Sequence, residues 1–278
     1  HPAAIFDYEA PWDLCERVNV GGMRNMCRLS LEHGVKRFVL FSTVSVYGSP
    51  RPEDLPVKET TARNPGTNYE KSKVMQEDVG MEYNAKGLPV SIIRPAPVYG
   101  PRNFYGFATI LFLMAKFPLM PFPTNMEGNI VGVNVRDVCN AAYFISTKEE
   151  AIGEAYNIID DSQYTIGEFV EFAAPMIDVK LLKIKAPQEL VFQLGYGFAE
   201  LTGMVAKAMG TRPFLEKDMV YYLKAVYGFS NDKIKALGYE LLYPDMKSGL
   251  VETIDWYKAH GHLDRKELWH KALFSKTK

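Results

Sequence analysis

Tyr69 and Lys73 stand four residues apart in the segment NPGTNYEKSK, and this pair could move a proton. Side chains at positions i and i+4 of a helix share one face, so the phenol and the ammonium would be neighbours. A free phenol titrates near 10, so a phenol acting as a base near neutral pH needs roughly 4 kcal/mol of extra stabilisation of its anion. A lysine ammonium within ~5 Å supplies part of this. The pair therefore predicts acid/base chemistry at a hydroxyl or ketone.

The elements around this pair predict where it lies. Residues 35–41 (VKRFVLF) form an apolar, β-branched run typical of a buried parallel strand, and Ser42 and Thr43 follow it. Ligands of open α/β sheets bind beyond the carboxyl ends of the strands, so these hydroxyls are placed for chemistry. The Pro-rich loop 49–65 leads to Thr67 or Asn68, either of which can cap the helix that carries Tyr69. Thr43 would hold a substrate oxygen while Tyr69 exchanges its proton.

The Y-x-x-x-K spacing alone is weak evidence, because Tyr243 and Lys247 repeat it. Pro244 directly follows Tyr243, so this second copy is expected in a loop that enters the last helix. On spacing alone, a plain surface pair at Tyr69 and Lys73 is equally acceptable. The order of the surrounding segments favours the catalytic interpretation: a strand, Ser-Thr, Val-Tyr-Gly, Y-x-x-x-K, and a strand that ends in Arg-Pro.

These segments resemble the extended short-chain dehydrogenase/reductases, which include nucleotide-sugar epimerases and 3-beta-hydroxysteroid dehydrogenases. The resemblance covers almost the whole chain. The matching segments are His1-Pro2-Ala3-Ala4, Asn19-Val20-Gly21-Gly22, Phe41-Ser42-Thr43, Val46-Tyr47-Gly48, Tyr69-x-x-x-Lys73, Arg94-Pro95-x-x-Val98-Tyr99-Gly100-Pro101 and Val133-Asn134-Val135-x-Asp137-Val138.

The resemblance implies an α/β fold with a Rossmann-like, doubly wound parallel sheet and a smaller, mostly helical substrate-binding part. It implies that Thr43, Tyr69 and Lys73 are catalytic and that NAD or NADP is the cofactor. It also implies a homodimer formed by the helices at 12–33 and 69–87. The residues that it implies along the cofactor are Ala3, Asn19, Ser42, Tyr69, Lys73, Pro95 and Val98.

The N-terminus departs from the family pattern. The family begins with a strand and a Gly-x-x-Gly-x-x-Gly loop that binds the pyrophosphate, and this chain starts past that point without Met. Without these amides and the helix dipole, we expect the chain as given to bind NAD(P) poorly. The residue that distinguishes NAD from NADP would also lie upstream, so the sequence does not predict the cofactor preference.

The remaining patterns predict two parts and a tail. Residues 1–103 and 128–160 are expected to form the cofactor domain, and residues 104–127 and 161–263 the substrate-binding region. The basic segment 264–278 is expected to be solvated, with weak contact to a membrane surface as the alternative. The expected helices are 9–33, 69–87, 135–144, 165–177, 187–209, one ending at Tyr227, and 247–260; the expected strands are the end of one at 1–4, 35–41, 88–94, 129–135, 155–159 and 180–185.

Composition narrows the partners. A net charge of −1 gives no electrostatic argument for nucleic acid. Cys15, Cys27 and Cys139 lack metal or disulfide spacing, which favours reduced, buried thiols in a cytoplasmic protein. His260 and His262 have no acidic or cysteine partners in the sequence, so we expect no metal site.

The function predicted from the sequence is hydride transfer between a nicotinamide cofactor and a secondary alcohol or ketone of a small-molecule substrate. A sterol-like substrate is favoured because the order PFL, FSNDKI, LGY and TIDWY resembles the 3-beta-hydroxysteroid dehydrogenase branch, and because residues 104–123 and 187–227 are mostly apolar. The alternatives are a sugar-nucleotide epimerase or dehydratase that uses NAD, and a non-catalytic NAD(P)-binding scaffold. The scaffold is disfavoured because both Tyr69 and Lys73 are present.

Overall fold

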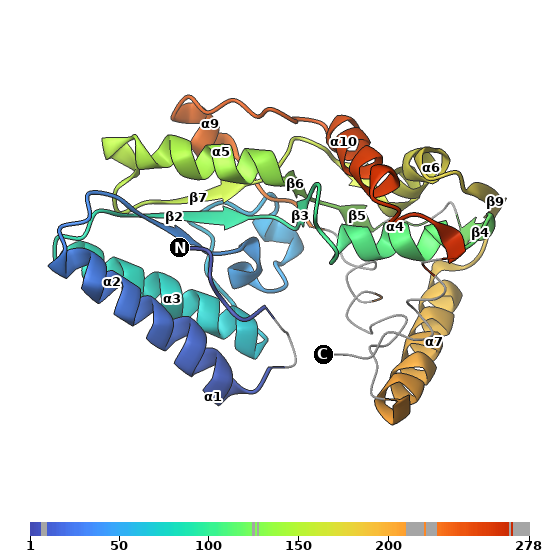
Figure 1. The fold of residues 1–278 in the computed structure, drawn as a ribbon, viewed down its shortest axis with the longest axis horizontal. Helices are drawn as coiled ribbons and strands as arrows, with labels where there is room; N and C mark the ends of the chain where they lie inside the picture. The colour runs from blue at the N-terminus through green and yellow to red at the C-terminus, as the bar shows by residue number, and fades with distance from the viewer. Residues whose placement is uncertain are drawn as a thin grey trace. The chain divides into compact units, whose positions relative to one another are not determined.

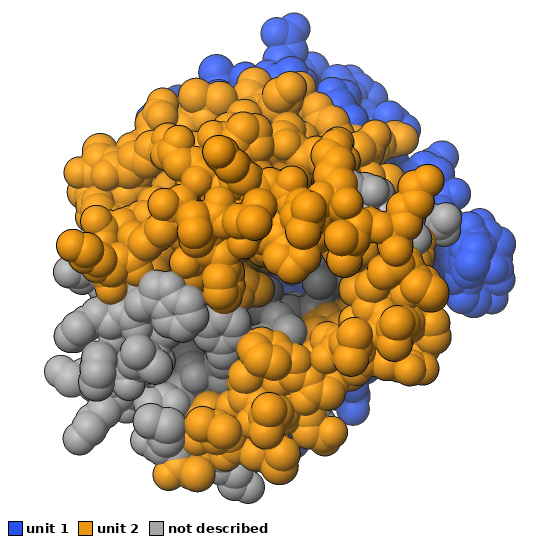
Figure 2. All heavy atoms as spheres, turned by 90° about the vertical axis from the view of Figure 1, so that its right-hand side faces the viewer, with its two compact units in different colours: residues 1–96, 132–161, 228–244 blue, residues 97–131, 162–227, 245–278 orange. Residues whose placement is uncertain are grey.

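The computed structural model describes residues 1–6, 10–123, 126, 128–209, 220, 227–266 and 268. Its chain divides into two compact units, which Figure 2 distinguishes by colour. The first unit contains His1–Ala96, Gly132–Asp161 and Gly228–Pro244, and the second contains Pro97–Val131, Ser162–Tyr227 and Asp245–Lys278. Within the described ranges, no helix combines the length and apolarity that crossing a bilayer requires.

The first unit is built on a parallel sheet of order β1-β2-β7. Phe38 of β1 is paired with Val90 of β2, and Ile92 of β2 with Ala155 of β7. Helices α2 and α3 cover one face of this sheet and α5 covers the other (Figure 1). The predicted doubly wound α/β arrangement is confirmed. The elements of this unit are α1 (Trp12–Cys15), η1 (Glu16–Gly21), α2 (Gly22–Glu32), β1 (Phe38–Phe41), η2 (Val44–Tyr47), η3 (Pro52–Asp54), α3 (Asn68–Ala85), β2 (Val90–Pro95), β6 (Val133–Asn134), α5 (Val135–Ser146), η4 (Glu149–Ala151), β7 (Ala155–Ile158) and α9 (Asp232–Ala236).

The buried face of the sheet explains why these segments are strands and helices. β2 is buried along its whole length, as expected for a strand covered on both sides. Leu40 and Val90 pack with Met23 and Cys27 of α2 and with Val79 of α3 in one apolar cluster. The helices therefore lie on the sheet because this removes their apolar faces from water.

The second unit is mostly helical. Its β4 and β9 pair in parallel, and β5 and β8 pair antiparallel. Its core gathers large side chains such as Tyr99, Leu111, Phe169, Leu250 and Tyr257. Its elements are β3 (Val98–Tyr99), α4 (Phe107–Ala115), β4 (Leu119–Pro123), β5 (Asn129–Ile130), β8 (Tyr164–Thr165), α6 (Ile166–Met176), β9 (Lys180–Ile184), α7 (Gln188–Met209) and α10 (Met246–Ala259).

The division into units differs from the sequence-based one at several boundaries. Residues 97–103 and 128–131 lie in the second unit, whereas residue 161 and residues 228–244 lie in the first. The main chain explains the place of residues 228–244, because Val57 N–H donates to Gly228 O at 2.7 Å and Ser230 N–H donates to Val57 O at 2.9 Å. A segment far along the chain thereby joins the Pro-rich loop. The roles of the two units in binding stay predictions.

The long helix expected at residues 9–33 is interrupted. Between α1 and α2 the segment Glu16–Gly21 forms a π-helical turn. Residues 1–4 form no strand, although His1 is bonded to β1 through Val39 O and the N–H of Phe41. Of the predicted thiols, Cys15 and Cys27 are buried, whereas Cys139 is exposed on α5, which corrects the expectation for that residue. The helix expected to end at Tyr227 and most of the basic segment 264–278 lie outside the described residues.

Gly48 provides a test of how the loop after β1 is held. Its φ of 63° and ψ of −134° favour glycine, and a Cβ there would lie 2.0 Å from Asn64 O. We expect Gly48→Ala to destabilise the protein by about 3 kcal/mol, from backbone strain and from the clash together. Urea unfolding measures this loss.

Gly34→Ala is the matched control. Gly34 also has a positive φ, 61°, but no other described atom lies within 4 Å of a Cβ built there. Its cost should therefore be the backbone term alone, about 1 kcal/mol. Equal losses for the two variants would show that Asn64 does not confine Gly48.

Candidate active site

The start of α3 is fixed by a capping box, which places Tyr69 in the first turn. The Thr67 hydroxyl accepts a hydrogen bond from Glu70 N–H at 3.2 Å, and the Glu70 carboxylate accepts from Gly66 N–H at 2.7 Å and Thr67 N–H at 2.9 Å. These bonds satisfy amides that a helix start leaves open. The predicted helix start is therefore confirmed, and Tyr69 and Lys73 lie one turn apart on it.

Lys73 is buried, and its ammonium reaches the end of β1. Its Nζ donates a hydrogen bond to Phe41 O at 2.6 Å, and Lys73 as a whole is 3% exposed. Burial lowers the pKa of Lys73 to about 8, and the negative charge of Glu77 opposes this shift. The ammonium thus lies beside the strand end that precedes Ser42 and Thr43.

The two hydroxyls that follow β1 have different surroundings. Ser42 Oγ is buried and has no hydrogen-bond partner in the described part of the chain. Thr43 caps η2: its Oγ1 accepts from Ser45 N–H at 3.1 Å and lies 3.1 Å from Ser45 Oγ. Helix α3 packs against η2, so the structure brings Thr43, Tyr69 and Lys73 to the same end of the sheet in one unit.

Tyr69 is 6% exposed and lies against the N-terminal segment 1–6. The ring of Phe6 meets the Tyr69 ring edge-on, with 5.1 Å between the centroids. Such edge-to-face pairs are favourable because the ring edge is positive and the face is negative. The segment before Asp7 therefore forms one side of the surroundings of Tyr69.

Asn19 links this segment to α3. Its Oδ1 accepts from Ile5 N–H at 2.7 Å, and its Nδ2 donates to Ile5 O at 3.2 Å and to Ser72 Oγ at 2.8 Å. Ser72 Oγ donates in turn to Tyr69 O at 2.7 Å. Asn19 is fully buried in the π-helical turn, and Gln76 Nε2 donates to its carbonyl oxygen. The side-chain amide of Asn19 is thus hydrogen-bonded to the main chain of Ile5, and its contact with a cofactor stays a prediction.

The other residues expected along a cofactor lie in three places. Ala3 is exposed in segment 1–6, and Pro95 is buried at the end of β2. Val98 is half-buried in β3 and belongs to the second unit. The structure therefore assigns Ala3, Asn19, Ser42, Tyr69, Lys73 and Pro95 to the first unit, and Val98 to the second.

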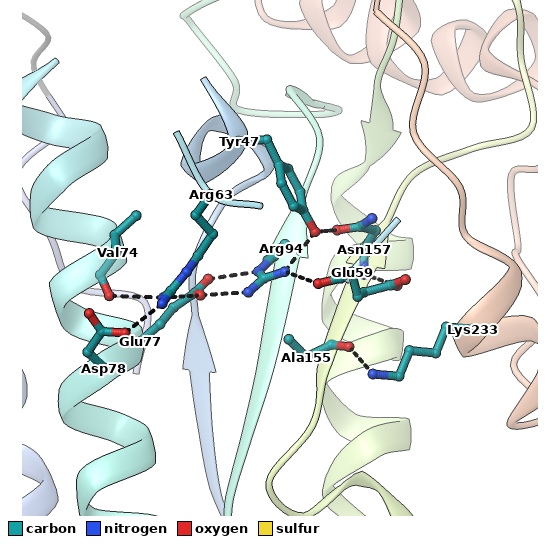
Figure 3. A network of polar contacts seen from close by, with 10 residues as sticks. All are labelled: Tyr47, Glu59, Arg63, Val74, Glu77, Asp78, Arg94, Ala155, Asn157 and Lys233. Atoms are coloured by element: carbon teal, nitrogen blue, oxygen red, sulfur yellow. Dashed lines mark hydrogen bonds and ion pairs between the residues drawn. The ribbon is translucent and has the colours of Figure 1, made fainter. Parts of the chain in front are cut away.

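A buried polar network ties α3 to the strand ends (Figure 3). Arg94, at the end of β2, donates to both carboxylate oxygens of Glu77, with distances of 2.9 and 2.7 Å. Arg94 Nη1 also donates to Tyr47 OH at 2.7 Å, and Tyr47 OH donates to Asn157 Oδ1 of β7 at 2.9 Å. Side chains from or after all three strands are therefore joined to one helix.

Sequence reasoning missed this network. Its signal was an arginine within a buried apolar strand, because a buried guanidinium requires a carboxylate partner. Glu77 stands four residues after Lys73 and so lies on the same face of α3. The Pro-rich loop 49–65 is also bonded to β7, because Glu59 Oε1 accepts a hydrogen bond from Asn157 N–H at 2.8 Å.

Asp137 and Tyr243 lie outside the candidate site and have structural surroundings. The buried Asp137 accepts from the N–H groups of Leu242 and Tyr243 at 2.7 and 3.0 Å and from Tyr239 OH at 3.1 Å. Tyr243 lies in the loop before α10, as its Pro244 neighbour predicted. The second Y-x-x-x-K pair is therefore not on one helix.

Comparison with known proteins identifies relatives of this arrangement. The sequence profile of the NAD dependent epimerase/dehydratase family matches residues 5–158. The N-acetyl-alpha-D-glucosaminyl-diphospho-ditrans,octacis-undecaprenol 4-epimerase of Escherichia coli O157:H7 is 26% identical over 266 residues, which cover 93% of this chain and 76% of that protein. Short-chain dehydrogenase/reductase family 42E member 1 of Mus musculus is 26% identical over 264 residues, covering 89% of this chain and 66% of that protein.

A solved structure has the same fold. DesIV, the dTDP-glucose 4,6-dehydratase of Streptomyces venezuelae with NAD and TYD bound, superimposes with a TM-score of 0.67 at 20% identity. The match covers 94% of this chain and 72% of that one. The chain spans 60%, 76% and 66% of the lengths of three curated relatives.

Removing one partner of the buried pair tests its contribution to the fold. We expect Arg94→Met to lower the free energy of unfolding by about 3–5 kcal/mol, because the Glu77 carboxylate would lose its principal buried partner. Urea unfolding at neutral pH measures this loss.

Arg24→Met serves as the control, because Arg24 pairs with Glu82 at 3.5 Å with both side chains about half exposed. Such a pair is screened by water, so the stability should stay within experimental error. A loss at Arg94 no larger than that at Arg24 would show that the network does not hold α3.

Proposed function

Since its residues 5–158 match that profile, the chain belongs to the NAD-dependent epimerase/dehydratase family, and we propose that it acts as an oxidoreductase. In this proposal a hydride moves between a nicotinamide cofactor and a secondary alcohol or ketone. The observation that carries the proposal is the position of Lys73, which lies one turn from Tyr69 and donates to Phe41 O at 2.6 Å, directly before Ser42 and Thr43.

Each residue has a separate role in the reaction. Tyr69 gives its phenolic proton to the substrate oxygen or takes it back, according to the direction of the reaction. The Lys73 ammonium stabilises the phenolate, because opposite charges one helical turn apart attract in a site with little water. Thr43 donates a hydrogen bond to the substrate oxygen and holds it beside the phenol. When bound, the nicotinamide ring supplies or accepts the hydride.

The residues present fit such a cofactor. Ser42 Oγ is buried without a hydrogen-bond partner among the described residues, and an unpaired buried hydroxyl is costly unless a ligand or water satisfies it. Ser42, Tyr69 and Lys73 would hold the cofactor by hydrogen bonds. Ala3, Asn19, Pro95 and Val98 would lie along it, as the family resemblance implies.

A sterol-like or otherwise apolar substrate fits the second unit best. Its α7 carries exposed apolar side chains, among them Leu190, Leu194 and Phe198. Residues 104–123 and 187–227 contain one arginine, Arg212, whereas arginine is the residue best suited to bind a diphosphate through two parallel hydrogen bonds.

A sugar 4-epimerase is the second candidate. The Escherichia coli O157:H7 relative, whose name gives it this activity, matches 93% of the chain, and the same Tyr69 and Lys73 chemistry would serve it. A dehydratase is less favoured, because eliminating water needs an acid and a base besides Tyr69. Residues 42–48, which follow β1, contain hydroxyls but no carboxylate. A non-catalytic scaffold would have no need of the buried lysine beside Tyr69.

Tyr69→Phe tests the assigned chemistry. We expect turnover to fall by at least ~100-fold, because the phenol is the proton donor and acceptor. Folding should change little, and cofactor affinity should fall by no more than ~10-fold, because only one of the hydrogen bonds that hold the cofactor is lost. Turnover of hydroxysteroids is followed by NAD(P)H absorbance. Turnover of nucleotide sugars is followed by chromatography of the products, because an epimerase returns its cofactor to the starting form in each cycle. The two assays also separate the two candidate substrate classes.

Tyr243→Phe is the matched control, because it alters the tyrosine of the second Y-x-x-x-K copy. Its turnover should equal that of the wild type. Full turnover in Tyr69→Phe would refute the role of Tyr69, and turnover of nucleotide sugars alone would favour the epimerase.

We further propose that two copies associate through the first helices and α3. Val18, Met26 and Leu29 point outward from the first helices with about 40% exposure, and Met81 does so from α3. Exposed apolar side chains grouped on neighbouring helices favour contact with another protein surface.

We expect Leu29→Arg to halve the mass found by sedimentation equilibrium, whereas Leu242→Arg, at another exposed leucine, should leave a dimer. A monomeric wild type would contradict this arrangement.

A further inference from the structure

Glu77 is a buried carboxylate that none of the steps above uses. It stands one turn after Lys73, which itself stands one turn after Tyr69, so the three residues follow one face of α3. Its side chain is 2% exposed. An ionised carboxylate this deeply buried is costly, so a function that needs the charge would explain its presence.

We propose that Glu77 is a positioning residue that acts through Lys73: its carboxylate, held by Arg94 and Arg63, keeps the Lys73 ammonium charged beside Tyr69. This inference rests on the proposed function of Tyr69 and Lys73. It adds a second charge pair to the site, beside the proposed pair of the Lys73 ammonium and the Tyr69 phenolate.

The geometry gives the carboxylate one position. Arg94 holds both of its oxygens, and Arg63 Nη1 donates to Oε2 at 3.2 Å. Arg94 is in turn fixed by Tyr47 OH at 2.7 Å (Figure 3). A carboxylate bound at both oxygens cannot turn away from the helix, so its charge stays at a constant place relative to Lys73.

The charge of Glu77 matters because the surroundings of Lys73 disfavour an ammonium. With Glu77 in place, burial still lowers the pKa of Lys73 to about 8. The carboxylate opposes this shift, so without its charge the pKa would be lower and less of the residue would be an ammonium near physiological pH. Arg63 and Arg94 offset part of the carboxylate's charge, so removing either arginine should strengthen its effect on Lys73.

Other titratable groups lie near this pair and are part of the balance. The amino group of His1 interacts with Lys73, since the Lys73 charge lowers the pKa of that amino group. Among the described residues, the groups that face this region from α3 and from the elements packed on it include Tyr69, Glu77, Arg63, Arg94, Tyr47, Glu59, the His1 amino group and Cys27.

A titration of Lys73 by NMR tests the inference without cofactor or substrate. The chain is labelled with 13C at the lysine Cε, and the Lys73 signal is assigned as the one lost in Lys73→Arg. Its pKa is then measured in the wild type, Glu77→Gln, Arg63→Gln and Asp78→Asn. Arg63 is one-third exposed, so its replacement should leave the fold intact.

The inference predicts shifts of opposite sign. Glu77→Gln should lower the pKa of Lys73 by about 1, because an opposite charge is lost, and Arg63→Gln should raise it by a smaller amount. Asp78→Asn is the matched control: it removes the neighbouring carboxylate, which also binds Arg63 at 2.8 Å but is 56% exposed, and should shift Lys73 much less. In a plot of kcat/KM against pH, the midpoint of the change caused by loss of the Lys73 proton should move in the same directions.

Two results would overturn the inference. One is a Lys73 pKa that is the same in folded Glu77→Gln as in the wild type. The other, which decides if Glu77→Gln does not fold, is an unchanged or lowered Lys73 pKa in Arg63→Gln. Absence of turnover in wild-type protein saturated with NAD(P) would contradict the proposed function alone, because the titration does not depend on it.

Discussion

The ion pair of Arg94 and Glu77 joins a helix to a sheet at a place that water hardly reaches, with side chains 7% and 2% exposed. Two charges removed from water are costly, and this cost is recovered only when the geometry satisfies both groups. Here the guanidinium binds both carboxylate oxygens and also reaches Tyr47, whose hydroxyl continues to Asn157. The pair therefore tolerates little sliding of α3 along the strands. The position of Tyr69 and Lys73, nearer the start of α3, is therefore fixed relative to the sheet as well.

Helix α3 both forms this ion pair and carries Tyr69 and Lys73, because the three residues are spaced four positions apart. Tyr69, Lys73 and Glu77 follow one face, which runs from the strand ends into the interior of the first unit. Its first turn is fixed by the capping box of Thr67 and Glu70, and its third turn by Arg94. Lys73 lies between these two fixed points and donates to Phe41 O. A long lysine side chain is thereby held in one conformation.

Sequence patterns predicted the parts of this fold that depend on near neighbours. The β1 strand, the start of α3 and the loop position of Tyr243 follow from apolar runs, caps and a proline, all of which act within a few residues. The pairing of Arg94 with Glu77 does not, because it depends on which helix packs beside β2. The membership of residues 228–244 in the first unit likewise depends on Val57, far away in the sequence.

The interruption of the first helix was also beyond local rules. Its hydrophobic pattern is helical throughout, and the π-helical turn forms where Asn19 reaches Ile5 and Ser72. Hydrogen bonds to a distant main chain decide this conformation, and a periodicity argument contains no information about them. The catalytic assignment of Thr43, Tyr69 and Lys73 rests on resemblance for roles, while the structure adds their shared location in one unit.

The π-helical turn Glu16–Gly21 also has a consequence for how this region can vary. A π turn accommodates one residue more than an α-helical turn would, so every side chain after it is rotated by about 100° relative to an unbroken helix. Met23 and Cys27 face the sheet only because of that rotation. The segment should therefore accept substitutions at its exposed positions but not the loss of a single residue, which would turn the apolar side of α2 toward solvent. The geometry of this turn therefore depends more on its number of residues than on the identity of its exposed side chains.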